Sequence, residues 1–146
     1  MKIGYGKAKI TPPVGVELNG YGFFLRRRNK GVLEDLYARA VVLELAGETV
    51  LFFEADLIGL TPELSDTLED AILQKYGIKK ECILIASIHT HTGPSTGVLC
   101  GAGEIDLSCY RGMHDKFMCA VDEALADMEE ETGASADVAG EISHVC

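Results

Sequence analysis

A strand–helix–strand pattern over residues 49–88 constrains the fold of this chain more than any other feature. Residues 49–57 are mostly apolar, as expected of a central strand that is covered on both faces. A helix is predicted to begin after Thr61, which is a hydroxyl N-cap, and to end at the C-cap residue Gly77. The next apolar run, residues 82–88, predicts a second strand, and a right-handed crossover makes it parallel to the first.

The remaining segments predict a single α/β domain in which two helices flank a mixed sheet. Residues 36–45 are expected to form a hairpin with residues 49–57, because a glycine-containing turn separates two strand-like runs. A second amphipathic helix is predicted over residues 113–131. The glycine-rich stretches 14–31 and 98–112 have no regular period and are predicted to be loops. The predicted strands comprise residues 2–10, 36–45, 49–57, 82–88 and 136–145.

Composition and charge limit the classes of function that this chain could have. Hydrophobic residues make up 47% of the chain and charged residues 25%, which is ordinary for a soluble globular protein. The net charge of −10 argues against nucleic acid as a partner, because phosphate backbones attract cationic surfaces. Neither a transmembrane run nor a secretory signal is seen, so we expect a cytoplasmic protein. The five cysteines, odd in number and irregular in spacing, predict reduced thiols.

Two histidines stand directly after the predicted strand 82–88. His89 and His91 are two positions apart, and Gly93 with Pro94 ends any strand at this point. In α/β folds the carboxyl edge of the sheet is where ligands bind. Imidazole is a common zinc ligand and titrates near neutral pH, so the pair is a candidate metal or acid–base site. The alternative is that one or both rings only hydrogen-bond a tight loop.

Asp56 closes the strand 49–57 and is expected on the same edge as the histidines. If the two strands are parallel, their carboxyl ends lie side by side, so Asp56 is a candidate catalytic residue close to His89. A carboxylate beside an imidazole is a metal ligand or the group that orients the ring. The alternative is that Asp56 caps a loop or the following helix. The basic run from Arg26 to Arg28 binds a carboxylate or phosphate, or is a solvated loop.

Five segments, in order, carry a resemblance to a known family. They read IGYGKAKITP from Ile3, GYG from Gly20, LYARA from Leu36, EADL from Glu54 and HTHTGP from His89. In this order they resemble the amino-terminal part of the neutral/alkaline ceramidases. The histidine segment is the most specific of them. Family members typically read T-H-T-H-S-G-P there, and this chain departs from that pattern at Ile88 and Thr92.

The resemblance implies a zinc-dependent amidase that hydrolyses the N-acyl bond of ceramide or a related N-acyl lipid. It places His89 as a zinc ligand and His91 beside the metal, in contact with the reacting amide. Zinc would activate water at neutral pH, and a donor such as His91 would stabilise the oxyanion. The family's other ligands, a histidine, a glutamate and a tyrosine, come from later sequence.

The chain, residues 1–146, therefore corresponds to an amino-terminal domain that carries only part of the active site. We expect either a piece of a longer enzyme or a shortened homologue, and we expect the chain by itself not to hydrolyse ceramide. The carboxyl-terminal part of the same protein or a second copy would complete the zinc shell. An acyl chain would need an apolar groove, for which the candidates are Leu18, Tyr21, Phe23, Phe24 and Leu25.

Two other interpretations stay open at the level of sequence. The first is a non-catalytic module that binds a ligand or a partner through the same crevice. The second is an amidase or esterase that acts on a substrate other than a lipid. Zinc binding by the purified chain separates an enzyme from a module.

Overall fold

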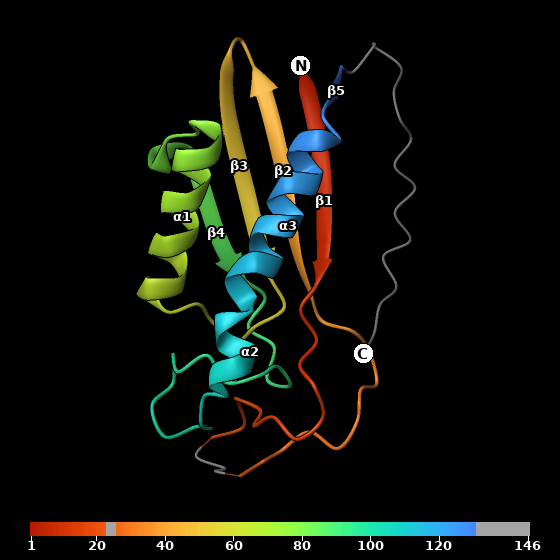
Figure 1. The fold of residues 1–146 in the computed structure, drawn as a ribbon, viewed down its shortest axis with the longest axis vertical. Coiled ribbons are helices and arrows are strands. Elements are labelled where there is room, and N and C mark those ends of the chain that lie inside the picture. Colours follow the sequence, from red (N-terminus) through yellow and green to blue (C-terminus); the bar gives the residue numbers. More distant parts are fainter. Residues whose placement is uncertain (23–25, 131–146) are drawn as a thin grey trace.

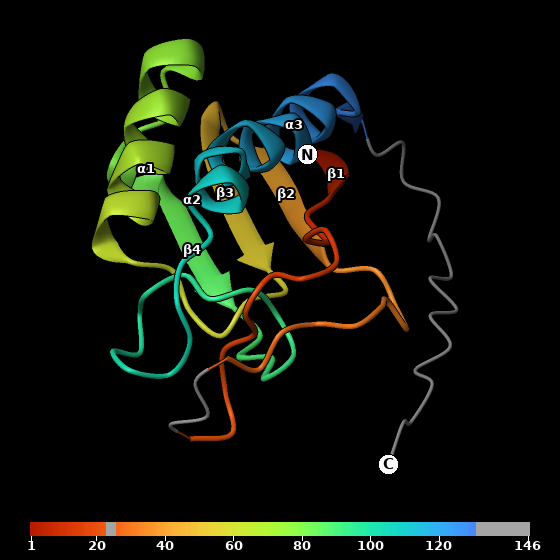
Figure 2. The same ribbon diagram turned by 60° about the horizontal axis from the view of Figure 1, so that its bottom comes forward.

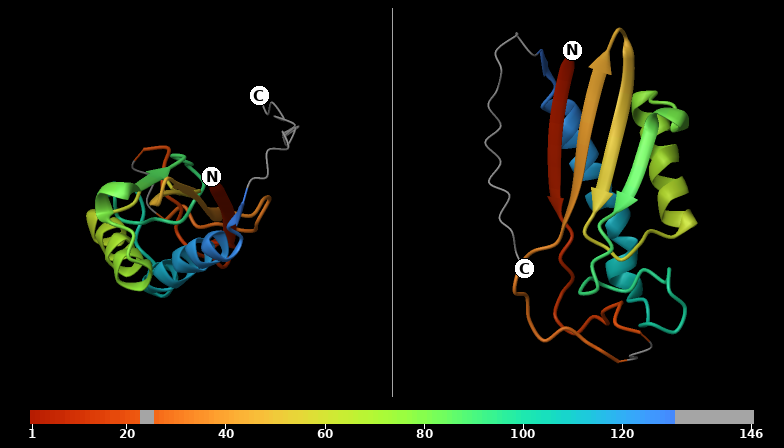
Figure 3. Two further views of the ribbon diagram at one scale, coloured as in Figure 1. Left: turned by 90° about the horizontal axis from the view of Figure 1, so that it is seen from above. Right: turned by 180° about the vertical axis from the view of Figure 1, so that it is seen from behind.

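The computed structural model describes residues 1–22 and 26–130, and it forms one sheet with its helices on one face (Figure 1). Seen from behind, the strands lie in front of all the helices (Figure 3). The elements are β1 (Lys2–Lys9), β2 (Tyr37–Leu45), β3 (Glu48–Ala55), α1 (Pro62–Tyr76), a short 3-10 turn (Lys80–Cys82), β4 (Ile83–Ser87), α2 (Leu107–Arg111), α3 (Met113–Ala126) and β5 (Glu129–Glu130).

The sheet is mixed, as predicted, with strand order β4-β3-β2-β1-β5. β1, β2 and β3 pair antiparallel, whereas β3 and β4 pair parallel, with Ala55 opposite Ser87 at their carboxyl ends. The β2–β3 hairpin turns at Ala46 and Gly47, which both have positive φ, as the tight turn of a twisted hairpin requires. The predicted hairpin and the parallel pair are thus both confirmed.

Helix α1 begins and ends at the predicted residues. The hydroxyl of Thr61 accepts a hydrogen bond from the backbone N–H of Leu64 at 3.3 Å. Gly77 adopts a left-handed conformation, and its N–H bonds the carbonyl of Leu73 at 2.9 Å. The helix buries Leu64, Leu68 and Ile72 against the sheet.

Helix α3 lies against β1 at unusually short range. A Cβ built on Gly4 or Gly6 would lie 2.0 Å from the carbonyl oxygen of Ala124 or Ala120, respectively, so only glycine permits this approach. The same helix places Phe117 against Phe53 of β3, with ring centroids 5.0 Å apart. The core therefore lies between the sheet and the helices.

The opposite face of the sheet carries apolar side chains that no described element covers. Tyr5, Val41, Phe52 and Leu84 form one row across the four long strands, because each is the register partner of the next. Tyr5 is 47% exposed, Phe52 41% and Leu84 57%. Side chains alternate between the two faces along each strand, so this row alternates with the buried core.

The structure differs from the prediction at the end of α3 and in the loop 98–112. Helix α3 ends at Ala126, not at 131, and residues 129–130 instead pair with β1. Within the predicted loop 98–112, α2 forms because the carboxylate of Asp106 accepts hydrogen bonds from the N–H groups of Ser108 and Cys109. The predicted strand 136–145 lies outside the described residues. None of the described helices has the length and apolar character that spanning a membrane requires.

Candidate active site

The candidate site lies at the edge of the sheet where β3 and β4 end. Residues 10–22, 26–36 and 88–106 gather at this edge, beside the connection from β3 to α1 (Figure 2). His89 and His91 follow β4, and Asp56 follows β3. The parallel pairing of the two strands thus brings the predicted site residues to the same edge, as their order in the chain predicts.

His89 is held by the backbone of the β3–α1 connection. Its N–H donates to the carbonyl of Leu57 at 3.0 Å, and its ring Nδ1 lies 2.7 Å from the carbonyl oxygen of Ile58. A carbonyl only accepts, so the proton of the neutral ring is on Nδ1, and Nε2 keeps its lone pair. His89 also has a φ of 64°, a strained conformation for a residue other than glycine. The residue as a whole is exposed.

The ring of His91 lies next to the ring of His89. Their ring centroids are 4.9 Å apart, with an interplanar angle of 72°. On the other side, Tyr21 meets His91 edge to face at 5.3 Å. The sequence pattern therefore brings both imidazoles together, but it gave no signal that Tyr21 would contact one of them.

The glycine-rich loop holds the histidine loop from the side of β1. The N–H of Asn19 bonds the carbonyl of Gly93 at 3.0 Å, and the N–H of Ser95 bonds the carbonyl of Glu17 at 3.0 Å. Gly20 has a φ of 107°, and a Cβ there would lie 2.5 Å from the Cβ of His91. The loop is thus built against the histidines, with special backbone angles as predicted.

A buried carboxylate stabilises the glycine-rich loop itself. Glu17 is 5% exposed, and it accepts hydrogen bonds from the N–H groups of Arg26 and Glu104. The bond from Glu104 is the main reason that the pKa of Glu17 lies below its usual value. Arg28 adds its charge at 3.7 Å, so part of the predicted basic cluster binds an internal carboxylate.

Asp56 is near the histidine loop, but its carboxylate bonds other groups. Its two oxygens lie 2.7 and 3.1 Å from the guanidinium of Arg39, and one of them also accepts from the N–H of Tyr37 at 2.8 Å. This bidentate pair raises the pKa of Arg39, mainly through the hydrogen bond. The main-chain oxygen of Asp56 lies beside Gly93, 3.3 Å from where a Cβ on that glycine would be. A catalytic role for Asp56 stays a prediction.

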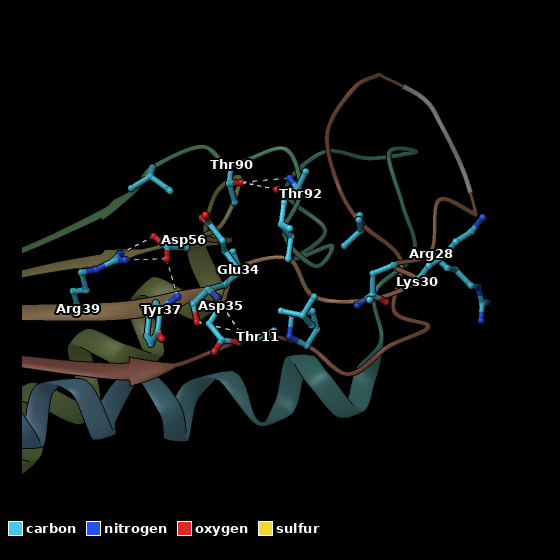
Figure 4. A pocket seen from close by; sticks show the side chains of 18 residues that line it. Thr11, Arg28, Lys30, Glu34, Asp35, Tyr37, Arg39, Asp56, Thr90 and Thr92 are labelled. Atoms are coloured by element: carbon cyan, nitrogen blue, oxygen red, sulfur yellow. Dashed lines mark hydrogen bonds and ion pairs between the residues drawn. The ribbon is translucent and has the colours of Figure 1, made fainter. Parts of the chain in front are cut away.

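A cavity of about 880 Å³ opens beside the histidine loop (Figure 4). Asp56, Arg39 and Tyr37 line one side of it, and Thr90 and Thr92 line the other. The threonine hydroxyls lie 3.2 Å apart, whereas the two imidazoles are not part of the lining. Of the proposed acyl groove, Leu18 lines this cavity and Tyr21 contacts His91. Phe23, Phe24 and Leu25 lie outside the described residues.

The remaining candidate metal ligands do not cluster. Across residues 1–22 and 26–130, no group of three or more His, Cys, Asp or Glu side chains could hold a metal ion. Cys82, Cys100, Cys109 and Cys119 are free thiols, and burial raises the pKa of Cys109. Zinc binding by His89 therefore stays a prediction.

Comparison with known proteins identifies the class of this domain. The profile of the family described as neutral/alkaline non-lysosomal ceramidase, N-terminal, matches residues 1–129. The chain belongs to this family, which confirms the resemblance carried by its five segments. No match was found among curated proteins.

Two solved structures share the fold. Neutral ceramidase from Pseudomonas aeruginosa superposes with a TM-score of 0.77 at 24% identity, over 88% of this chain and 22% of that one. A ceramidase complexed with C2 superposes with a TM-score of 0.75 at 23% identity, over 88% of this chain and 21% of the other. The chain thus spans about a fifth of the length of these solved proteins.

Proposed function

We infer that this chain is the amino-terminal part of a zinc-dependent amidase that hydrolyses the N-acyl bond of ceramide or a related N-acyl lipid. In this proposal His89 is a zinc ligand and His91 lies beside the metal. Membership of the family supports the substrate class. The observation that carries the assignment of His89 is the bond between its Nδ1 and the carbonyl of Ile58.

The chemistry of His89 fits zinc. A metal-binding histidine usually donates its second ring N–H to a carbonyl or carboxylate, which fixes the tautomer and the ring orientation. Here the carbonyl of Ile58 is that acceptor, at 2.7 Å, and Nε2 keeps its lone pair. The strained φ of His89 shows that the surrounding loop imposes this position.

Two imidazoles are fewer ligands than zinc takes, since a catalytic site usually has three protein ligands and one open position. We propose that the missing ligands come from polypeptide beyond the residues described, in the same protein or in a second copy. When bound, zinc would supply a Lewis acid and an activated water at neutral pH.

The chain's own residues would then position the amide. The ring of His91 lies 4.9 Å from that of His89, so a carbonyl that reaches the pair meets a second hydrogen-bonding imidazole. The cavity beside Thr90 and Thr92 offers hydroxyl groups and apolar side chains to the rest of the substrate. In this proposal the carboxylate of Asp56 accepts hydrogen bonds from the guanidinium of Arg39 and the N–H of Tyr37, and so fixes both residues in the cavity wall.

Zinc titration tests the assignment. We expect the wild-type chain to bind zinc weakly in calorimetry and His89→Ala to lose that binding, because the ring with the fixed tautomer is removed. His114→Ala is the matched control, since His114 lies on α3 and its Nδ1 is 3.8 Å from Asp115. It should bind zinc like the wild type.

Two results would contradict the proposal. Equal zinc binding by wild type and His89→Ala would place the metal on other side chains, such as the cysteines. No zinc binding by the wild type at any concentration tested would instead favour a module that binds a ligand or a partner without catalysis.

A further inference from the structure

Arg27 joins the glycine-rich loop to the histidine loop through one nitrogen atom. Its Nη2 donates to the carbonyl of Asn19 at 2.8 Å and to the carbonyl of His91 at 2.7 Å. Both bonds are short and charge-assisted, and the side chain is half-buried. Arg27 therefore holds the main chain of His91 at a fixed distance from Asn19.

The same loop also contacts the side chain of His91. The guanidinium of Arg27 lies 5.1 Å from the centre of the Tyr21 ring, and Tyr21 meets the ring of His91 edge to face. Behind His91, Gly20 leaves no room for a Cβ. His91 is thus held at its carbonyl, at its ring and at its Cβ by one short segment.

The two imidazoles depend on different supports. The carbonyl of Ile58 orients His89, as described above, whereas no hydrogen bond to a ring nitrogen of His91 is found among residues 1–22 and 26–130. The placement of the His91 ring therefore depends on its backbone and on its ring contacts with Tyr21 and His89. The His91 backbone and the Tyr21 ring both contact Arg27.

We propose that Arg27 is a positioning residue for His91. It fixes the His91 backbone and the Tyr21 ring, and so sets the spacing of the two imidazoles without touching the substrate. The role rests on the proposed function, in which the pair faces zinc and the reacting amide. Neither the basic run in the sequence nor the family motif assigns it.

Nuclear magnetic resonance of the metal-free chain tests the positioning directly. In the wild type we expect ring-to-ring NOEs from His91 to both His89 and Tyr21. Arg27→Met keeps the aliphatic volume but removes both donors, and it should reduce these NOEs by more than half. Arg27→Lys can still donate to the two carbonyls and should restore most of the signal. Arg26→Met is the matched control, because Arg26 is an exposed neighbour, and it should leave the NOEs unchanged.

A zinc titration of the same variants measures the consequence for the site. Arg27→Met should weaken zinc binding about tenfold, the lower end of the loss caused by removing a group that orients a metal site. Arg26→Met should bind like the wild type. A wild type that binds no zinc would contradict the proposed function. The NOEs of the metal-free chain would still test the role of Arg27, because they do not depend on zinc.

Unchanged His91 NOEs in a folded Arg27→Met variant would overturn the proposal. Should that variant fail to fold, the wild-type spectrum decides. Slowly exchanging guanidinium protons of Arg27 with NOEs to the His91 main chain are expected, and rapid exchange without such NOEs would also overturn it.

Discussion

At the scale of single residues, Glu17 links the pH of the solution to the stability of the site. It is a carboxylate in a buried position, and backbone N–H groups, that of Glu104 foremost, hold its pKa below the usual value. A lowered folded-state pKa contributes stability that is fully present above the unfolded-state pKa of about 4.3. That contribution is lost as the pH falls through the folded-state pKa.

We therefore expect the wild type to lose stability between about pH 5 and pH 3 more steeply than Glu17→Gln, with a slope difference of at most one proton. The glutamine does not titrate, so its variant should be less stable at pH 7 and should approach the wild type in acid. Thermal unfolding at pH 7, 5, 4 and 3 measures this. Parallel curves for the two proteins would show that Glu17 does not carry the effect.

At the scale of elements, the contact of α3 with β1 depends on two glycines. Gly6 faces the carbonyl of Ala120 so closely that an added Cβ would lie 2.0 Å from the oxygen. Gly6→Ala should therefore lower the free energy of unfolding by about 3 kcal/mol or more, because helix and strand must separate. Urea denaturation measures the loss.

Gly31→Ala is the control for this substitution, because a Cβ at Gly31 meets nothing within 4 Å. It should change the free energy of unfolding by no more than about 0.5 kcal/mol. Similar losses in both variants would show that the loss does not come from the α3–β1 contact, because an alanine at Gly31 meets no such contact.

Elements with local signals were predictable from the sequence. Caps such as Thr61 and Gly77 act within one helical turn, and the turn at Gly47 acts within one hairpin, so neighbouring residues suffice to reveal them. The end of α3 was missed, because residues 129–130 leave the helix to pair with β1, which lies at the other end of the chain. Contacts of that kind leave no periodic pattern.

In the site, too, local patterns were predictable from the sequence and contacts between distant parts of the chain were not. His89 and His91 stand in one motif, and the parallel strands explain why Asp56 is near them. The partner of Asp56 was not predictable, since Arg39 meets it across the β2–β3 pair. Likewise, Arg27 reaches His91 across 64 positions of the chain, and nothing in the basic run indicates that one of its members bonds carbonyl groups.

At the scale of the whole molecule, the two faces of the sheet differ in what covers them. Phe53 is 1% exposed and lies under the helices, whereas its neighbour Phe52 is 41% exposed on the opposite face. Phe53→Ala should lower the free energy of unfolding by about 3–5 kcal/mol. Phe52→Ala should lower it by about 1 kcal/mol, because much of that ring already meets water.

Both variants replace a phenylalanine of β3 with alanine. Chemical denaturation of the two therefore compares the stability that each face of the sheet contributes. Equal losses would contradict the layering, since they would require a cover over Phe52 within this chain. A continuous apolar row beside a parallel strand pair is typical of a surface that contacts other polypeptide. The chain in which this row occurs spans about a fifth of the length of the two solved ceramidases.

The bond from His89 to the carbonyl of Ile58 also has a consequence for protein engineering. The motif HTHTGP is short enough to copy into another loop, but its geometry is not portable. The tautomer of the first ring is set by the β3–α1 connection, and the second ring is placed by the glycine-rich loop. A graft that aims to reproduce the pair must therefore transplant three chain segments together, because the six-residue motif alone carries neither support.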